Sequence, residues 1–412
     1  MESAAAAAGW GLGAVDGVLP PELLLDVLLR LPAGPICRLR AVCRSWLAFT
    51  TDPHFVAAHA ARHPAPLLAV GVQGFPRLCV DLVDLSGNLV KQILRVGKGR
   101  VVSGSSADRV LVAGEDHSVR VLNPTTGSIS ILPSHRCGGA DPSTIAAWFA
   151  FGQTASTGEC KLVRILLNID NSRHLSEVIT IGDTDGEWRE TANPPGYLGW
   201  NCTNGVVFKG AAYFILDYCF SDPSFLERGC MPSFDFATEK WSVALQGPLN
   251  RILEESNGTL SYHDLANQLM LSGLKGTLCT SHWNDQFYTV DLWFLTDSEK
   301  GTWSKDHRIN VDAVFHGIGD YLKVQPLLVT DEGKIVLSMQ MGSKGVVQIY
   351  DPVTDTSSDI IQISIYTGAS VFTGSLLCPQ SVGRALYEVL PQSWALRIST
   401  ALMMFRFGVI KV

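Results

Sequence analysis

Residues 18–62 read VLPPELLLDVLLRLPAGPICRLRAVCRSWLAFTTDPHFVAAHAAR, and almost every position of this stretch fits a helical explanation. Apolar residues recur in it at the spacing of amphipathic helices. Pro32 ends one helix because a proline pushes the preceding residue out of the α region, Pro35 can open another, and Asp52 can cap a third. The pattern predicts three helices, of which the second runs from Pro35 through Leu47.

Four short elements of this stretch occur in the order of the F-box pattern. They are Leu19-Pro20, Arg30-Leu31-Pro32, Val42-Cys43-Arg44-Ser45-Trp46 and Asp52-Pro53-His54-Phe55. The stretch therefore resembles an F-box. Amphipathic helices alone would favour a helical cap packed on a larger domain, and the order of the motifs outweighs that alternative. The resemblance implies docking on the small adaptor of an SCF-type cullin-RING ubiquitin ligase, and through it on a cullin. It assigns adaptor-contact or motif-shaping roles to Leu19, Pro20, Leu28, Leu31, Pro32, Val42, Cys43 and Trp46.

Composition narrows the class of protein. The chain has 412 residues, 46% hydrophobic and 17% charged, which is typical of a globular chain with a substantial core. A net charge of −7 without a dense basic run argues against a nucleic-acid partner. The apolar segment 393–410 is interrupted by arginines and short for a membrane span, so we expect no membrane partner. Ten scattered cysteines and no apparent secretory signal favour the cytoplasm, the nucleus or both.

The character of the chain changes after residues 64–66, a proline-containing linker. From Leu67 onward short apolar runs alternate with turns, as in the three-strand meander 109–132 and the segments 290–305 and 327–350. Strand, acidic turn and returning strand recur at intervals of roughly 50 to 60 residues, slightly longer than common propeller blades. Small sheets of this kind bury both faces by radial stacking, which predicts a β-propeller of antiparallel blades, about six and within a range of six to eight.

These units, placed after an F-box, look like the kelch-like F-box-associated domain of the large plant class of F-box proteins. The expected architecture is multi-domain, with a small all-α F-box of three helices followed by an all-β propeller. The expected boundaries are a disordered tail at 1–15, the F-box at 16–63, the linker at 64–66, the propeller at 67–378 and a helical tail at 379–412.

Motifs of catalysis are not found. Gly97-Lys98-Gly99-Arg100 lacks the spacing of a phosphate loop and is interpreted as a glycine-rich hairpin turn. His59 and His63 share a helical spacing but lack the glutamate of an H-E-x-x-H motif, so we expect solvent-exposed histidines at a helix end. The sequence predicts neither a cofactor nor a metal, and no catalytic residue.

Large aromatic residues mark the candidate surfaces of the propeller. Those in long loops are weak candidates for binding a protein target, the alternative being that they pack back on the propeller. They are Tyr197, Trp200, Tyr218, Phe220, Trp283 and Phe287. The strand tryptophans Trp188, Trp241, Trp293 and Trp303 are expected to pack inside or between blades.

The resemblance implies a non-catalytic substrate receptor, in which the F-box joins the ligase and the propeller captures a protein target of unknown identity. Two alternatives stay open. One is an F-box scaffold or regulator acting outside a ligase, which would bind the adaptor without target turnover. The other is a propeller that binds a carbohydrate or another small molecule and carries a helical appendage.

Overall fold

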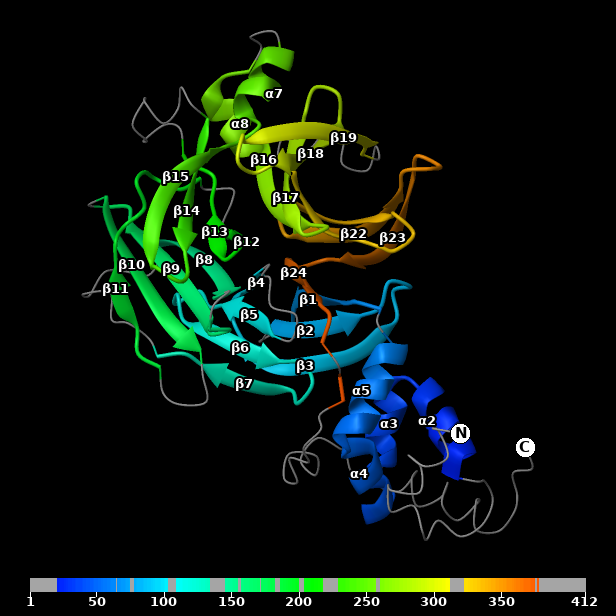
Figure 1. Ribbon diagram of the computed structural model, residues 1–412. Helices are drawn as coiled ribbons and strands as arrows, with labels where there is room; N and C mark the ends of the chain where they lie inside the picture. Colours follow the sequence, from blue (N-terminus) through cyan, green and yellow to red (C-terminus); the bar gives the residue numbers. More distant parts are fainter. Residues whose placement is uncertain are drawn as a thin grey trace. The chain divides into compact units, whose positions relative to one another are not determined.

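The computed structural model describes residues 21–377 except 64, 75–77, 103–108, 134–144, 155–156, 171, 182–185, 200–203, 218–228, 257–259, 312–321 and 375. The chain forms two compact units (Figure 1). The helical unit contains the described residues up to 63 together with Leu376 and Leu377, and the propeller unit is Ala65–Gly374. The predicted tails at 1–15 and 379–412 lie outside the described residues.

The described part of the helical unit contains four helices, α2 (Pro21–Arg30), α3 (Ala33–Leu39), α4 (Arg44–Thr51) and α5 (Pro53–Arg62). The structure confirms the predicted end of α2 and the predicted start of α5. Helix α2 ends before Pro32, and Asp52 caps α5, where its carboxylate accepts hydrogen bonds from the backbone N–H groups of His54 and Phe55.

The second predicted helix is in fact two helices. Arg40–Val42 form a turn and Cys43 is extended (φ −158°, ψ 169°), so α3 and α4 change direction between them. The Arg40 side chain fixes this break, because its guanidinium donates to both Oγ1 and the carbonyl oxygen of Thr50 near the end of α4. The break places the side chains of Ile36 and Phe49 in one core, which a single straight helix would separate.

The core of the helical unit is small and contains residues from before and after the propeller. Its buried residues are Leu28, Ile36, Phe49, Phe55, Val56 and Leu377. Leu377 is only 1% exposed. The sequence analysis expected the propeller to extend to residue 378, whereas the Leu377 side chain packs in the core of the helical unit.

The propeller unit consists of six four-stranded antiparallel sheets, which confirms the predicted fold class and the expected blade count. From inner to outer strand, blade 1 is β24 (Tyr366–Phe372), β1 (Leu67–Gln73), β2 (Leu78–Val83) and β3 (Leu89–Gly97); blade 2 is β4 (Arg100–Val102), β5 (Val110–Ala113), β6 (Val119–Asn123) and β7 (Ser128–Ile131); blade 3 is β8 (Ile145–Gln153), β9 (Cys160–Asn168), β10 (Arg173–Ile181) and β11 (Arg189–Thr191). Blade 4 is β12 (Val206–Phe208), β13 (Ala211–Tyr213), β14 (Cys230–Asp235) and β15 (Lys240–Gln246); blade 5 is β16 (Leu269–Leu274), β17 (Thr277–Asn284), β18 (Thr289–Asp297) and β19 (Thr302–Asn310); blade 6 is β20 (Lys323–Val329), β21 (Ile335–Met341), β22 (Lys344–Asp351) and β23 (Thr356–Ile363). Two short helices, α7 (Leu249–Glu255) and α8 (Tyr262–Gln268), lie in the connection between blades 4 and 5.

The ring is closed by the last strand. Strand β24 pairs antiparallel with β1 and is the inner strand of blade 1, with Phe372 opposite Leu67 (Figure 1). The first and last residues of the propeller strands are thus register partners, so the chain enters and leaves the propeller at the same place.

The topology gives the propeller two distinct faces. Four antiparallel strands return the chain to the side on which a blade began, so all inner strands start on one face. We call this the loop face; it carries the connections between blades and the turns between the second and third strands. The opposite linker face carries the remaining turns, the start of β1 and the end of β24.

Tryptophans join successive blades in a repeating contact. The indole N–H of Trp188, Trp241 and Trp303, each at the start of an outer strand, donates to a carbonyl at the end of the preceding blade's outer strand. The acceptors are Pro133 (2.6 Å), Ala192 (2.7 Å) and Gln246 (2.8 Å). With Trp293 at 1% exposure in the core, the predicted role of all four tryptophans in packing within and between blades is confirmed.

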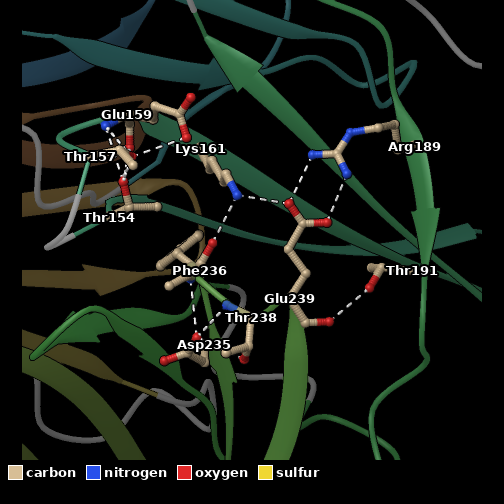
Figure 2. A network of polar contacts seen from close by, with 11 residues as sticks. Thr154, Thr157, Glu159, Lys161, Arg189, Thr191, Asp235, Phe236, Thr238 and Glu239 are labelled. Atoms are coloured by element: carbon tan, nitrogen blue, oxygen red, sulfur yellow. Dashed lines mark hydrogen bonds and ion pairs between the residues drawn. The ribbon is translucent and has the colours of Figure 1, made fainter.

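A polar network adds to the junction of blades 3 and 4 (Figure 2). The Glu239 carboxylate, in the turn before β15, accepts two hydrogen bonds from Arg189 and one from Lys161 Nζ at 2.8 Å. Lys161 Nζ also donates to the Phe236 carbonyl oxygen. The hydrogen bonds from Arg189 hold the pKa of Glu239 below its ordinary value. The network is therefore a structural clamp whose charges are already paired.

The segment Gly97-Lys98-Gly99-Arg100 is not a hairpin turn. Gly97 ends the outer strand of blade 1 and Arg100 begins the inner strand of blade 2, so the segment crosses from blade to blade on the loop face. Its glycines serve this tight crossing. Gly99 has φ +152°, and a Cβ at this position would lie 2.2 Å from the Ala113 carbonyl oxygen.

Candidate functional site

The candidate adaptor-binding residues divide into buried and exposed groups. Leu28 is 2% exposed, and Leu31 and Trp46 pack against the same core. Pro32, Val42 and Cys43 lie on the surface. Leu19 and Pro20 lie outside the described residues. Within the described part of the unit, Leu28 thus shapes the fold, whereas Val42 is the large apolar candidate available to a partner.

Helix α2 has a second apolar side that the sequence reasoning did not separate from the first. Leu24, Leu25, Leu28 and Leu29 face or pack against the core, whereas Leu23 is 54% and Val27 is 48% exposed. A helix that is apolar nearly all round can bury only one stripe against a small core. The spacing of Leu23 and Val27, one turn apart, was the available signal that they share the other stripe.

The outward stripe of α2 is held in place by α5. Asp26 forms ion pairs with Arg30 (2.6 Å) and with Arg62 (2.8 Å). The ring nitrogens Nε2 of His59 and His63 contact the carbonyl oxygens of Leu31 (2.8 Å) and Leu29 (3.0 Å), at the end of α2 where helix carbonyls lack partners.

His59 is not the exposed histidine that its position near a helix end suggested. It is 3% exposed and stacks on His63 with ring centroids 4.2 Å apart. Burial is the main cause that lowers its pKa, and the neighbouring charges of His63 and Arg40 act in the same direction. The expectation of an exposed side chain holds for His63 alone.

The candidate target-binding aromatics also divide. Tyr197 packs against the blade core and against His174, with ring centroids 4.9 Å apart, and Trp283 is 8% exposed. Phe287, in the turn between β17 and β18, is 72% exposed. The remaining three candidates, Trp200, Tyr218 and Phe220, lie outside the described residues.

Phe287 shares the loop face with two exposed apolar residues that the sequence reasoning missed. Ile169 is 48% exposed in the turn between β9 and β10, and Ile365 is 49% exposed between β23 and β24. All three lie in connections that the topology assigns to the loop face. No periodicity marks single apolar residues in turns, so only the strand order brings them to one side.

The described residues contain neither a metal-ligand cluster nor a membrane-spanning helix. Among them, no three histidine, cysteine, aspartate or glutamate side chains gather as metal ligands would. In that same part of the chain, none of the helices has the length and apolar character needed to cross a bilayer.

Comparison with known families settles the assignment that the two units suggest. An F-box-like family model matches residues 17–57, which include the helices α2 to α4. A second model, described as the F-box associated beta propeller domain, matches residues 83–368, and these reach from blade 1 around the ring to β24. The chain belongs to the F-box-associated β-propeller family.

Proteins similar to this F-box protein are found in the plant Arabidopsis thaliana. F-box protein CPR1 of Arabidopsis thaliana is 23% identical over 343 residues, which cover 77% of this chain and 79% of the relative. The putative F-box protein At4g21240 of the same plant is 25% identical over 71% of this chain and 68% of its own length.

Among solved structures, TolB from Acinetobacter baumannii is similar with a TM-score of 0.43 and 11% identity, covering 74% of this chain and 66% of that one.

F-box domains generally bind the small adaptor of SCF-type ligases, and F-box proteins are typically non-catalytic subunits.

Proposed function

We propose that this F-box protein is the substrate-receptor subunit of an SCF-type cullin-RING ubiquitin ligase. In this function the helical unit docks on the small adaptor, which joins it to a cullin, and the propeller captures a protein target for ubiquitination. The observation that carries the proposal is the outward stripe of α2 in a unit whose sequence matches the F-box-like family.

The energetics of the helical unit favour a docking role for that stripe. Its buried core consists of six described side chains, which is small for an independently stable domain. Leu23, Val27 and Val42 remain about half exposed. Covering them with a partner stabilises the folded unit by mass action and removes apolar surface from water. The proposed adaptor contacts therefore centre on these three residues, in addition to Leu19, Pro20, Pro32 and Cys43.

The two faces of the propeller support a division of labour. The chain enters and leaves the propeller at the linker face, whereas the exposed side chains of Ile169, Phe287 and Ile365 belong to the loop face. We place target capture on the loop face. The receptor then acts by raising the local concentration of a target lysine near the conjugating enzyme that carries ubiquitin. Other subunits supply the chemistry. Scattered free thiols are compatible with work in the cytoplasm or nucleus.

Adaptor binding is tested by Leu23→Asp combined with Val27→Asp. We expect co-purification of the adaptor to fall at least tenfold, because each change places a carboxylate where an apolar contact is proposed and burial of such a side chain is worth about 1.5–3 kcal/mol. Ala57→Asp is the matched control, since Ala57 is exposed on α5 of the same unit. Undiminished recovery of the adaptor with the double variant, at unchanged helical circular dichroism, contradicts the docking surface.

Target turnover separates the receptor from the regulator that acts outside a ligase. Affinity purification under proteasome inhibition, read by mass spectrometry, identifies bound proteins. A receptor shortens the half-life of such a protein, so depletion of the receptor lengthens it. A scaffold that binds the adaptor without turnover leaves the half-life unchanged.

A further inference from the structure

A pocket lies between blades 2 and 3 on the loop face. Its volume is about 390 Å³, within the range of ligand-binding pockets. Gly99 and Arg100 at the start of β4 line one side, together with Gly114, Glu115 and His117 in the turn after β5. The first half of β8 forms the opposite wall. The lining of β8 is apolar and runs from Ile145 to Phe149.

Arg100 is the charged group that dominates this pocket. Its Nη2 donates to the Ala147 carbonyl oxygen at 3.1 Å, and its guanidinium lies 5.9 Å from the centre of the Phe149 ring. Among the described residues, no carboxylate pairs with it; Glu115, which also lines the pocket, lies 3.9 Å from Lys98 Nζ. A guanidinium has five N–H donors, and the hydrogen bond to Ala147 uses one of those of Arg100.

Burial lowers the pKa of Arg100 to about 10, so the side chain stays cationic at neutral pH. A cation in apolar surroundings is costly unless it is paired and hydrogen-bonded. A fully buried guanidinium of the neighbouring blade is paired with a carboxylate. Arg164 is 2% exposed and binds the Glu177 carboxylate through Nε and Nη2. Arg100 is partly exposed, and among the described residues no carboxylate is paired with it.

Two contacts support the walls of the pocket. Arg164 Nη1 donates to the His117 carbonyl oxygen at 3.0 Å, which ties the turn of blade 2 to blade 3. On the other side, the close approach of Gly99 to the Ala113 carbonyl oxygen sets the path of the chain into Arg100. Preorganised walls reduce the entropy that a ligand must lose on binding.

We propose that this pocket binds an acidic side chain of the target protein, with Arg100 pairing with its carboxylate and the lining of β8 contacting an adjacent apolar residue. The proposal deepens the receptor function proposed above and rests on it. A carboxylate suits the site better than a phosphate dianion, because Arg100 is the one arginine or lysine among the described lining residues and the Glu115 carboxylate also lines the pocket. Arginine and a carboxylate can form two parallel hydrogen bonds, which gives recognition of geometry as well as charge.

The test uses the full-length chain purified with its adaptor. Displayed random twelve-residue peptides are selected on the protein, and the strongest peptide is synthesised with Glu, Gln or phosphoserine at its acidic position. We expect the selection to enrich Asp and Glu, and the Glu peptide to bind at least tenfold more tightly than the Gln peptide. Arg100→Gln, which removes the positive charge, should abolish this difference, and Arg100→Lys should retain part of it.

Lys344→Gln is the matched control, because Lys344 is exposed at the start of β22 on the same face. It should leave peptide binding unchanged, and melting curves should show that the Arg100 variants remain folded. A selection without acidic enrichment, equal affinities of the Glu and Gln peptides, or no effect of the folded Arg100 variants would overturn the proposal. Tightest binding of the phosphoserine peptide would overturn it in favour of a phosphopeptide site. If the original protein does not co-purify with the adaptor, the receptor function is refuted, whatever the result for peptide binding.

Discussion

His59 connects two helices through a single hydrogen bond to Leu31, and its ring is almost completely removed from water. Burial of the ring lowers the pKa below its value in the unfolded chain, about 6.5. The unfolded state therefore binds more protons below this pH, and the contribution of His59 to stability is present above it and lost as the pH falls through and below 6.5.

We predict that the free energy of unfolding of the helical unit decreases between pH 7.5 and pH 5.5 by at most about 1.4 kcal/mol per pH unit from this residue. His59→Gln should remove that part of the pH dependence, as measured by urea unfolding of the full chain followed by helical circular dichroism. His54→Gln is the control, since His54 is exposed on the same helix. A pH dependence identical in the His59 variant and the original chain argues against this role.

The short segment after β24 is an element of the helical unit although it is distant in sequence. Leu377 is 1% exposed among Leu28, Ile36, Phe49, Phe55 and Val56. Four residues, 63–66, separate α5 from β1, and another four, 373–376, separate β24 from Leu377. The helical unit is therefore completed by a residue that follows the whole propeller.

We predict that Leu377→Ala destabilises the helical unit by about 3 kcal/mol, because the substitution leaves a cavity in a core of few side chains. Urea unfolding monitored at 222 nm measures the effect. Leu376→Ala, at the half-buried neighbouring position, is the control and should cost less. An effect of Leu377→Ala no greater than that of Leu376→Ala would contradict the packing.

At the scale of the whole molecule, the closure of the ring by β24 determines whether the blades form one cooperative structure. Without β24 the edge of β1 is unpaired, and Leu68 and Val70, both 0% exposed, lose the strand beside them. Open apolar edges promote aggregation in place of cooperative folding.

We predict that a chain ending at Ile363 has no cooperative thermal transition of the propeller. A chain ending at Gly374 retains β24 and should keep that transition while its helical unit is weakened by loss of Leu377. Differential scanning calorimetry of the two truncated chains beside the full one gives the comparison. A sharp transition in the chain that lacks β24 would show that five complete blades and an open sixth suffice.

Much of the fold was predictable because it depends on local pattern. Neighbouring residues specify the cap at Asp52 and the helix end before Pro32. They also specify the meander of β5 to β7 and the recurrence of strand, turn and tryptophan. The family assignment likewise follows from motifs whose order and spacing are local. Hence the sequence by itself determined the two kinds of unit, about six blades and the link between the chain and F-box proteins.

Tertiary structure decided which side of each element faces outward, because burial depends on neighbours that are far apart in the chain. Leucines of one helix separate into core and surface only when α5 and Leu377 pack against it. The same reason explains why Gly97–Arg100 becomes a crossing between blades and not a hairpin. Arg100 and β8 belong to different blades and come together only because these blades pack side by side in the propeller. No spacing in the sequence could therefore have indicated a pocket for an acidic residue.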